Sequence, residues 1–474
     1  MDDSKQLWSI WQRLLGFFGG IFTRPGWVRF AQWVSGMVLC DEQHTITQEV
    51  TSLGLIPQWR NLEHFAEYGA FDERAVEGDL MRLVEQEHPC RFGRYHPTAV
   101  DDTKEMRSSL KVWGVCTFKH VSSRNPKHPK LVMAHNWVLM GDLAPGTGQE
   151  PWTYLPTAAR LYMRKSQLPA GESFRTKNEL AVEMLRQVDG VSEAPVLAIF
   201  DGGYARSKVV RPCLGVDEAA SQGRRIEILS RPRRDARLYK PLPPPPPPSA
   251  ALPPQPRRSG RRAKAKAAKG RRKGKAKSRR PGRPRKWGPR LPAPQQHTKW
   301  RVPWQAGQAW AYGRMRKFRC RAIDCRWAVS GPDTAVRVFA FVVEGYRDPW
   351  FIVTSALDLS AAQVLEAYTA RFRQEDAIRD QKQRLGMEEV RAWTKAPVLR
   401  TFLMQIVSMT LLRLTQWEWG ERRGEGWCPA PPWNRHKMRI SLLDMRRLFW
   451  KSRALFSHFL QAMDEVETTQ AAVA

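Results

Sequence analysis

The sequence predicts an α/β protein whose core is preceded by a helical region and interrupted by a basic insert. In the first ninety or so residues, apolar side chains recur at spacings of three and four, as on one side of a helix. From His96 the pattern changes to short β-type runs, with one helical segment before the last of them. After Tyr239 both patterns give way to prolines and then to lysines and arginines. We therefore expect a mixed central sheet with flanking helices, assembled from segments on both sides of the insert.

These changes of pattern divide the chain into six regions. The core is expected to be discontinuous in sequence, because the insert separates its two parts. The regions are a helical N-terminal domain (1–94), the first part of the core (95–240), a Pro-rich and Lys/Arg-rich disordered insert (241–295), the remainder of the insertion region (296–335), the second part of the core (336–418) and a C-terminal helical region (419–474).

Runs rich in β-branched and aromatic residues mark the expected strands. Four lie before the insert, at 98–100, 111–118, 131–140 and 196–200, and two after it, 336–343 and 350–354, are expected to form a hairpin. The clearest helix begins after Ser360, a plausible N-cap with Gln363 three residues on, and stops at Gly386. Beyond it, 399–417 is expected to be an amphipathic helix.

The charge of the chain indicates a polyanionic partner. Its 474 residues carry a formal charge of +32, and nucleic acid is the first expectation, with an anionic membrane surface second. No apolar run approaches the ~18 residues that span a bilayer, and the start lacks a secretory n-region, so we expect a cytoplasmic protein. The seven cysteines form no C-x-x-C pair and are expected to be reduced, mostly buried thiols rather than zinc ligands.

The insert is the most basic part of the chain. Six prolines (Pro243 to Pro248) precede a tract, 257–286, in which 17 of 30 residues are Lys or Arg and none is acidic. Like charges repel there and apolar residues are missing, so the tract cannot form a packed core. Subtracting these 17 charges from +32 still leaves +15, so the expectation of a nucleic-acid partner does not depend on the insert alone.

Two aspartate sites follow apolar runs before the insert. Asp201 comes directly after 196–200 and is followed by two glycines, which let a phosphate backbone approach closely. Asp101 and Asp102 follow 98–100. An aspartate at the end of a buried strand directs its carboxylate into a crevice at the sheet edge. The alternative for each site is an ordinary turn aspartate.

A third carboxylate lies on the helix that follows Ser360. Tyr368, Arg371, Glu375 and Lys382 fall within a stripe about 60° wide at ~100° per residue. One carboxylate beside a phenol, a guanidinium and an ammonium suits a metal ion bound next to a DNA phosphate. On this helix alone, a solvated face with ion pairs explains the stripe equally well. Together with the two aspartate sites, the pattern favours a site for two Mg²⁺ or Mn²⁺ ions that act on phosphodiesters.

At this point the sequence resembles a known family. The spacing of Tyr368, Arg371, Glu375 and Lys382 reproduces the YREK signature of bacterial insertion-sequence transposases, which have an RNase H-like catalytic domain and a DDE triad. The order Asp-Thr, then Asp-Gly-Gly-Tyr, then YREK strengthens the likeness, as do the motifs 135–138 and 385–386. The resemblance runs from about residue 36 to 417 and is weakest across the insert.

The resemblance implies roles for individual residues. Asp102, Asp201 and Glu375 become the catalytic and metal-binding triad, with Asp101 an alternative to Asp102, which is preferred because it directly precedes the threonine. Arg371 and Lys382 become phosphate contacts and Tyr368 a phosphate or base contact. The family also carries a β-rich insertion between the second aspartate and the glutamate, and whether one folds here is left open.

The resemblance further implies a function. The expected activity is metal-dependent cleavage at the inverted-repeat ends of a transposon and strand transfer into target DNA, by a homodimer that uses two Mg²⁺ ions, with Mn²⁺ as a substitute. The N-terminal helical domain (1–94) is expected to bind DNA, and no membrane is expected as a partner. The competing readings are a non-catalytic DNA-binding protein, either a decayed transposase or an architectural protein, and a structure-selective nuclease on the same fold.

One short motif in the insert points to DNA in another way. The segment 281–286 is similar to an AT-hook, whose Gly-Arg-Pro core lies in the minor groove of A·T-rich DNA. It makes Arg283, Arg285 and Lys286 candidate DNA contacts, although Pro281 replaces the arginine that usually precedes the glycine. Non-specific binding by counterion release is the alternative, and it also requires DNA.

Overall fold

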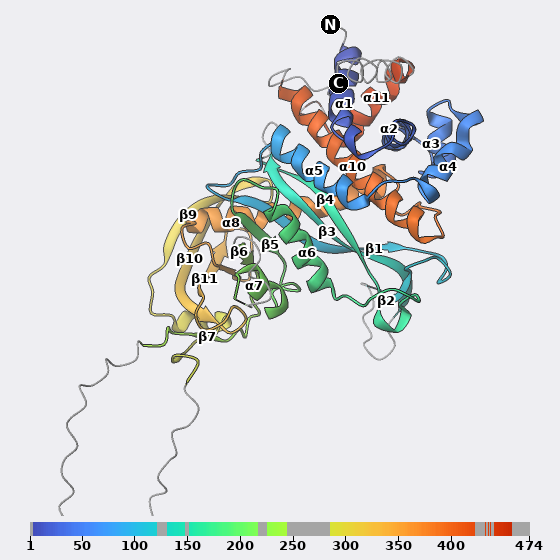
Figure 1. Ribbon diagram of the computed structural model, residues 1–474. Coiled ribbons are helices and arrows are strands. Elements are labelled where there is room, and N and C mark those ends of the chain that lie inside the picture. Colours follow the sequence, from blue (N-terminus) through green and yellow to red (C-terminus); the bar gives the residue numbers. More distant parts are fainter. Residues whose placement is uncertain are drawn as a thin grey trace, which may run out of the picture.

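A single mixed sheet with helices on both faces forms the centre of the molecule (Figure 1). The computed structural model describes residues 3–120, 130–146, 151–216, 225–243, 285–421 and 440–456, together with 432, 435 and 437. Most of the insert, residues 244–284, lies outside the described residues, and so do the expected disorder of that range and the AT-hook residue Arg283.

Helices occupy both ends of the chain and cover the sheet between them. The N-terminal helices are α1 (Asp3–Gly16), η1 (Gly19–Ile21), α2 (Arg24–Leu39), α3 (Ile46–Ser52), η2 (Ile56–Gln58), α4 (Trp59–Tyr68) and α5 (Glu73–Glu87). The later ones are η3 (Lys165–Gln167), α6 (Lys177–Asp189), α7 (Ser207–Cys213), η5 (Pro294–Lys299), α8 (Ala361–Ala370), α9 (Phe372–Arg384), α10 (Lys395–Glu421), α11 (Leu442–Lys451) and η6 (Arg453–Leu455).

The strands lie in the middle of the chain, on both sides of the insert. They are β1 (His96–Met106), β2 (Cys116–Lys119), β3 (Leu131–Pro145), β4 (Trp152–Tyr162), β5 (Val196–Phe200), β6 (Glu227–Ser230), β7 (Leu238–Tyr239), β8 (Arg290–Leu291), β9 (Gln305–Ala311), β10 (Arg314–Trp327), β11 (Ala335–Val343) and β12 (Trp350–Thr354).

The strand order shows how the two halves of the chain combine. It runs β2-β3-β1-β5-β6-β12-β11-β10-β7-β8, with β4 also paired to β3 and β9 to β10. β1, β5 and β6 are parallel, and the remaining described pairs are antiparallel. β6 pairs with β12, so segments separated by the insert meet in the middle of the sheet. β5 is buried along its whole length, as expected of a parallel strand covered on both faces.

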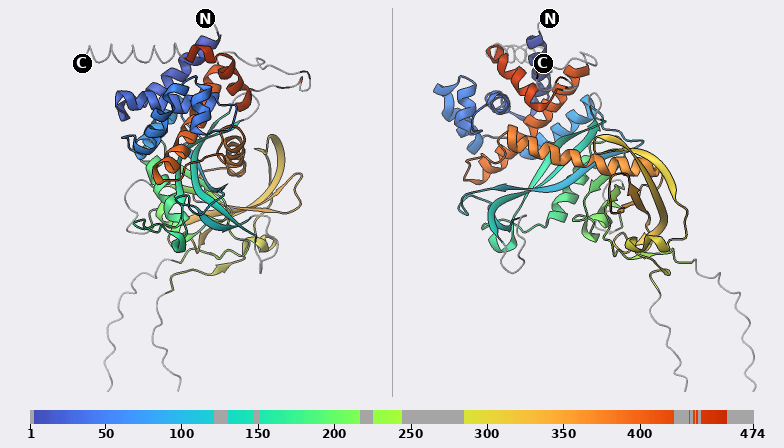
Figure 2. Two further views of the ribbon diagram at one scale, coloured as in Figure 1. Left: turned by 90° about the vertical axis from the view of Figure 1, so that its right-hand side faces the viewer. Right: turned by 180° about the vertical axis from the view of Figure 1, so that it is seen from behind.

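Different helices cover the two faces of the sheet (Figure 2). One core joins the α8, α9 and α10 face of the sheet to the N-terminal helices and α11. The other core packs α6 and α7 against the opposite face. The N-terminal helices begin at polar caps, with Thr23 accepting from Gly26 before α2 and Asp72 accepting from Arg74 before α5. The expected N-terminal helical region is therefore present, and it packs on the sheet through α10.

The helix α10 is buried rather than amphipathic. It is the one described helix long and apolar enough to cross a membrane by length and composition, and 89% of its apolar window is buried inside the molecule. The expectation of an amphipathic helix over 399–417 was therefore wrong. The polar side chains of this helix are paired inside the molecule: Gln405 donates to the Leu385 and Gly386 carbonyls, and Arg413 pairs with Asp380.

The insertion region contains a folded β subdomain. β9, β10 and β11 form a curved antiparallel sheet, and β7 and β8 bring the two ends of the insert together at its far edge. In Figure 2 this sheet curls around α8. The last part of the expected disordered range is ordered, because Arg290 and Leu291 pair with Leu238 and Tyr239.

Other boundaries also differ from expectation. β1 continues past residue 100 to Met106, because β3 is long enough to pair with it as far as Ala134. The run 111–118 is mostly loop, and only β2 at its end is a strand. β4 was not expected at all, although its register with β3 covers ten pairs. The strand 196–200, the hairpin and the helix start at Ser360 are confirmed, the last by a capping box with Gln363. Gly386 ends α9 with φ of +61°, as expected.

Gly141 provides a test of how tightly β3 and β4 pack. Their register shifts between Met140 and Gly141, and a Cβ on Gly141 would lie 2.7 Å from the Pro156 Cα and closer still to the Leu155 carbonyl oxygen. Because backbone atoms cannot move aside cheaply, Gly141→Ala is expected to lower the free energy of unfolding by about 2 kcal/mol. Gly16→Ala, an exposed site with no neighbour within 4 Å, is the control and should change it by less than ~1 kcal/mol. Equal effects in urea denaturation would contradict this packing.

Candidate functional site

Asp101 and Asp201 come together because β1 and β5 are parallel neighbours. In their register Val100 lies beside Phe200, and the next step of the same register places Asp101 beside Asp201. Paired strands are ~4.8 Å apart, so the two side chains are adjacent. Asp201 is the first residue after β5, whereas Asp101 lies inside β1, which continues to Met106. The expectation that both aspartate sites end a strand is therefore right for Asp201 only.

The alternation of side chains along β1 puts Asp101 and Asp102 on opposite faces of the sheet. Ala99 in β1 and Ile199 in β5 both belong to the core beneath α8, α9 and α10. Two residues further on, Asp101 and Asp201 point to this same face. Asp102 points to the other face, toward α6.

The helices α8 and α9 bring Arg371 and Glu375 to the first face. The expected helix is interrupted at Arg371 (φ −50°, ψ −29°), which joins α8 to α9. The Arg371 guanidinium donates to Asp101 Oδ2 (2.8 Å) and to Glu375 Oε1 (3.2 Å). Glu375 is the most open of the three, with 48% of its side chain exposed. Tyr368, one turn before Arg371, is buried. The structure thus unites Asp101, Arg371 and Glu375, next to Asp201.

Asp102 has different partners. Lys177, the first residue of α6, donates to Asp102 Oδ2 (2.5 Å), and the Tyr204 hydroxyl lies 3.3 Å from Oδ1. Burial and the Asp102 charge raise the pKa of Tyr204, so this phenol stays protonated and can donate. Asp102 is therefore held in a bonded network behind the sheet, and the structure does not bring it to Arg371 or Glu375.

The charges on the α8–α9 face are incompletely balanced. The pKa of Asp101 is raised to about 6. Burial is the largest cause, the nearby Arg371 charge opposes it, and the charges of Asp201 and Asp102 add to it. Burial also raises the pKa of Tyr368. Arg371 contacts two of the three carboxylates there, and the charge of Arg231 also acts on Tyr368, so a cation bound between the carboxylates would further relieve their repulsion.

The loop after Asp201 fixes the position of its carboxylate. Its Oδ1 accepts from the Gly203 backbone N–H (2.7 Å), and a Cβ on Gly203 would lie 2.9 Å from that oxygen. A larger residue at 203 would push the Asp201 carboxylate out of this position, so the glycine allows the loop to fold back onto it. This contact is with the chain's own backbone, so the expected approach of a phosphate backbone to the glycines stays a prediction.

Comparison with known families agrees with this geometry. A model for DDE superfamily endonucleases matches residues 17–275, and one for the transposase DDE domain matches residues 174–411. Each spans at least half of the chain. The chain belongs to the DDE superfamily. No curated protein matches it. Membership implies nuclease activity, DNA as the polymer bound and a general use of divalent metal ions.

The carboxylates of this DDE protein fit divalent cations. Mg²⁺ and Mn²⁺ prefer carboxylate oxygens, and Asp101, Asp201 and Glu375 provide three carboxylates from three different elements. Burial is the main cause of the elevated pKa of Asp101, and the neighbouring Asp201 contributes to it, so a cation beside Asp101 would favour its charged form. The residues present therefore fit the metal ions that the superfamily uses.

The remaining sequence candidates of the DDE protein lie elsewhere. Lys382 donates to the Lys104 carbonyl (2.8 Å) and pairs with Glu388 (2.7 Å), further along β1 than Asp101. Arg285 and Lys286 are exposed just before β8, at an end of the sheet away from β1 and β5. The structure brings none of these three to the carboxylates.

An aromatic cluster beside the site was missed by sequence reasoning. Tyr312, at the β9–β10 turn, lies 5.3 Å from Phe372, 5.9 Å from Tyr346 and 5.7 Å from Trp350, measured between ring centroids. Arg371 and Glu375 both influence the Tyr312 pKa, which burial raises. Tyr312 has a left-handed φ of 49°, so its position is set by the turn. The cluster is assembled from two turns, the start of β12 and the start of α9, and no spacing in the sequence connects them; Phe372 alone could have been noticed, next to Arg371.

The Asp101 environment predicts a pH-dependent difference in stability. Its folded pKa, about 6, exceeds the unfolded value of ~3.9, so folding favours the protonated form. That stabilisation is full below pH ~4 and is lost as the pH rises through 6. Asp101→Asn should therefore gain about 3 kcal/mol relative to wild type between pH ~4 and ~7.5 without metal, measured by urea denaturation. Asp348→Asn, an exposed hairpin residue, controls for loss of a carboxylate. A difference that stays constant with pH would contradict the raised pKa.

Proposed function

We propose that this DDE protein is a DNA transposase of the YREK type, which cuts at the inverted-repeat ends of its element and joins them to target DNA. The observation that carries the proposal is the contact of Arg371 with both Asp101 and Glu375, on the face where Asp201 lies beside Asp101. We assign the triad to Asp101, Asp201 and Glu375. Asp101 takes the place that the sequence pattern favoured for Asp102, because only Asp101 has these contacts.

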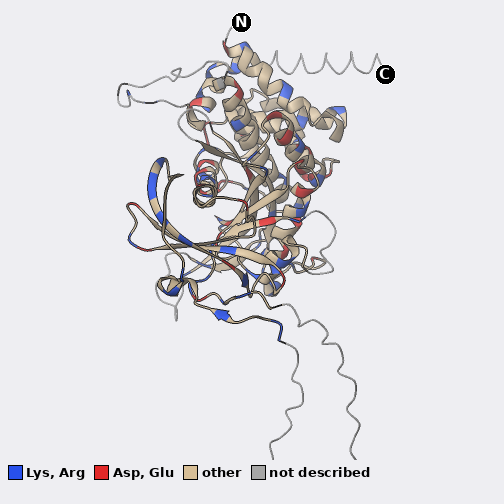
Figure 3. Ribbon diagram, turned by 90° about the vertical axis from the view of Figure 1, so that its left-hand side faces the viewer, with Lys and Arg blue, Asp and Glu red and all other residues tan. Residues whose placement is uncertain are grey.

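The strand order supports an RNase H-like core. β4, β3 and β1 are successive antiparallel neighbours, and β5 and β6 continue parallel to β1. Carboxylates at the centre of such a sheet, with the third on a helix packed against it, form an open face that a DNA backbone can reach. Figure 3 shows the lysines and arginines that recur along the curved β subdomain.

The three carboxylates would hold two divalent ions, either Mg²⁺ or Mn²⁺, in the mechanism that we propose. Bound there, such ions supply activation of water or of a 3′-hydroxyl and stabilisation of the leaving oxygen. Arg371 keeps Asp101 and Glu375 aligned in the absence of metal. When a cation replaces it as their partner, its guanidinium is free to bind a DNA phosphate near the cleaved bond.

The DNA path we propose leads from the carboxylates across the β subdomain. Tyr312 and Phe372 are each more than a third exposed beside the site and offer ring faces on which unpaired bases can stack. On β10, Arg319 and Arg321 stand over the Trp304 ring at 5.6 and 4.4 Å, and the exposed Arg319 is the proposed phosphate contact, whereas Arg321 donates to the His297 and Thr298 carbonyls. Lys382 would join Arg319 by exchanging Glu388 for a phosphate. The N-terminal helices and a second copy of the chain complete the proposed end complex.

The activity test uses DNA that carries the inverted repeats flanking the coding sequence. With Mg²⁺ or Mn²⁺, the wild-type protein is expected to cleave at the repeat ends and to join them to a target duplex. Glu375→Gln keeps the size of the side chain and should reduce cleavage at least ~10²–10³-fold, the usual loss when one group that stabilises developing charge is removed. DNA binding, measured in parallel, should survive. Cleavage without joining would indicate a structure-selective nuclease, and binding without metal-dependent cleavage a non-catalytic protein.

The two neighbouring aspartates give a matched pair. Asp101→Asn is expected to abolish cleavage to the same degree as Glu375→Gln, because it removes a carboxylate from the α8–α9 face. Asp102→Asn should retain activity within about tenfold, because Asp102 bonds to Lys177 on the opposite face. The reverse ranking, with intact folding of both variants by circular dichroism, would return the assignment to Asp102.

The basic tract should contribute affinity rather than chemistry. Deleting 257–286 removes 17 positive charges, so the log–log salt dependence of DNA binding should weaken by ~0.9 for each phosphate that the tract neutralises in the full chain. Cleavage by bound protein should persist, since the tract supplies no triad residue. If A·T-rich DNA loses more affinity than G·C-rich DNA, the AT-hook interpretation of Arg283, Arg285 and Lys286 is supported over counterion release. An unchanged salt slope would show that the tract does not touch DNA.

A further inference from the structure

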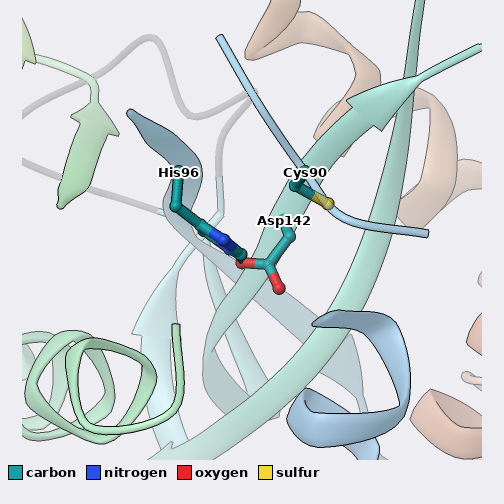
Figure 4. Close-up of side chains that lie close together, drawn as sticks. All are labelled: Cys90, His96 and Asp142. Atoms are coloured by element: carbon teal, nitrogen blue, oxygen red, sulfur yellow. Dashed lines mark ion pairs between the residues drawn. The ribbon is translucent and has the colours of Figure 1, made fainter. Parts of the chain in front are cut away.

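A second polar cluster lies at the other end of β1 from the carboxylates. It combines Cys90, from the loop between α5 and β1, with His96, the first residue of β1, and Asp142, on β3 (Figure 4). Each residue offers one ligand atom, and these atoms all lie within 4.8 Å of one another. We propose that this cluster binds a Zn²⁺-type transition-metal ion through the Cys90 thiolate, the His96 imidazole and the Asp142 carboxylate.

The cluster is buried and its polar atoms are poorly satisfied. The His96 and Asp142 side chains are 2% and 1% exposed. Asp142 Oδ1 accepts from the Thr98 hydroxyl (2.9 Å), but Oδ2 has no hydrogen-bond partner among the described residues. His96 Nε2 lies 3.0 Å from Oδ1 without the alignment of a hydrogen bond. Buried polar atoms are rarely left in this state, and a metal ion between them would satisfy both.

The surroundings of His96 are those of a metal ligand. Glu85 Oε2 lies 3.3 Å from His96 Nδ1, the ring nitrogen opposite the cluster, at ion-pair distance but, like Asp142, without the alignment of a hydrogen bond. A carboxylate at that nitrogen orients a histidine and leaves Nε2 directed at the metal, as in many zinc sites. Glu85 is itself held by Arg91 (3.0 Å), so it belongs to an outer layer rather than to the ligand set.

The charges of the cluster suit a divalent ion. A Cys90 thiolate and an Asp142 carboxylate would neutralise a 2+ ion, with His96 neutral and Glu85 balanced by Arg91. Tetrahedral zinc holds S, N and O ligands at ~2.0–2.3 Å, which places ligand atoms roughly 3.3–3.8 Å apart, so small side-chain rotations would close the site. Thiolate and imidazole ligands favour zinc over Mg²⁺, which prefers oxygen. The cluster is therefore chemically distinct from the three carboxylates.

The site would act as a structural tie. It would join the loop after α5 to two strands of the sheet, where the N-terminal helices meet the core. In the metal-free alternative the cluster is an ion pair. Although burial alone would lower the His96 pKa, Asp142 and Glu85 raise it to about 9, so the protonated ring would lie between two carboxylates. The two states differ in whether a metal–sulfur bond forms.

Cobalt substitution tests the proposal on the full chain. Protein freed of metal is titrated with Co²⁺, and a sulfur-to-cobalt charge-transfer band is expected at about one ion per chain. The three carboxylates contribute no sulfur, so Co²⁺ bound there cannot give this band. Cys90→Ser should abolish it and Asp142→Asn should weaken it. Cys213→Ser, at another buried free cysteine on α7, and Glu375→Gln should both retain it.

A second measurement guards against variants that fail to fold. In the Glu375→Gln background, which disables the carboxylate site, Zn²⁺ should raise the thermal unfolding midpoint of the metal-free chain and of its Cys213→Ser variant, but not that of its folded Cys90→Ser variant. A chain that gives no sulfur band and no rise in midpoint would overturn the proposal and leave the His96 ion pair in its place. A band that persists in Cys90→Ser would also overturn it, since the thiolate would then come from another cysteine.

Discussion

The parallel pairing of β1 with β5 is the constraint on which the rest of the site depends. Two carboxylates that repel one another are held side by side because the strands carrying them are buried and fixed in register. β5 cannot shift, since every one of its side chains is enclosed by one of the two cores. The folding of the sheet thus supplies the energy that keeps Asp101 and Asp201 together, and the pKa of Asp101 is raised mainly by its burial and in smaller part by Asp201.

A sheet covered on both faces gives neighbouring residues unrelated environments. Asp101 and Asp102 are adjacent in sequence, yet one meets Arg371 and the other Lys177. The first face carries the proposed chemistry and the second a closed hydrogen-bonded network. Arg371 is central to the first face because it compensates two carboxylates at once while lying at the junction of α8 and α9.

The position of the insert follows from the same architecture. It leaves the sheet after β7 and returns at β8, and these two strands pair with each other at the edge farthest from the N-terminal helices. When the two ends of a loop are fixed close together, lengthening the loop adds little to the entropy cost of closing it. The basic tract can therefore vary without disturbing the register of β1 and β5. At the opposite end of the molecule, α10 ties the N-terminal helices to the sheet through a surface that is buried all round.

The sequence by itself determined the helices and strands whose signals are local. Only the tertiary structure decided which side chains from distant segments contact one another. The apolar run before Asp201, the Ser360 capping box and the Gly386 stop each depend on a few consecutive residues, and each lies where it was expected. Adjacent aspartates carry no local signal of which face α8 and α9 cover, so the choice between Asp101 and Asp102 required the register of the sheet. β4, the buried character of α10 and the metal-type cluster at the start of β1 likewise depend on segments far apart along the chain. Folding brings these together because strands distant in sequence are neighbours in the sheet.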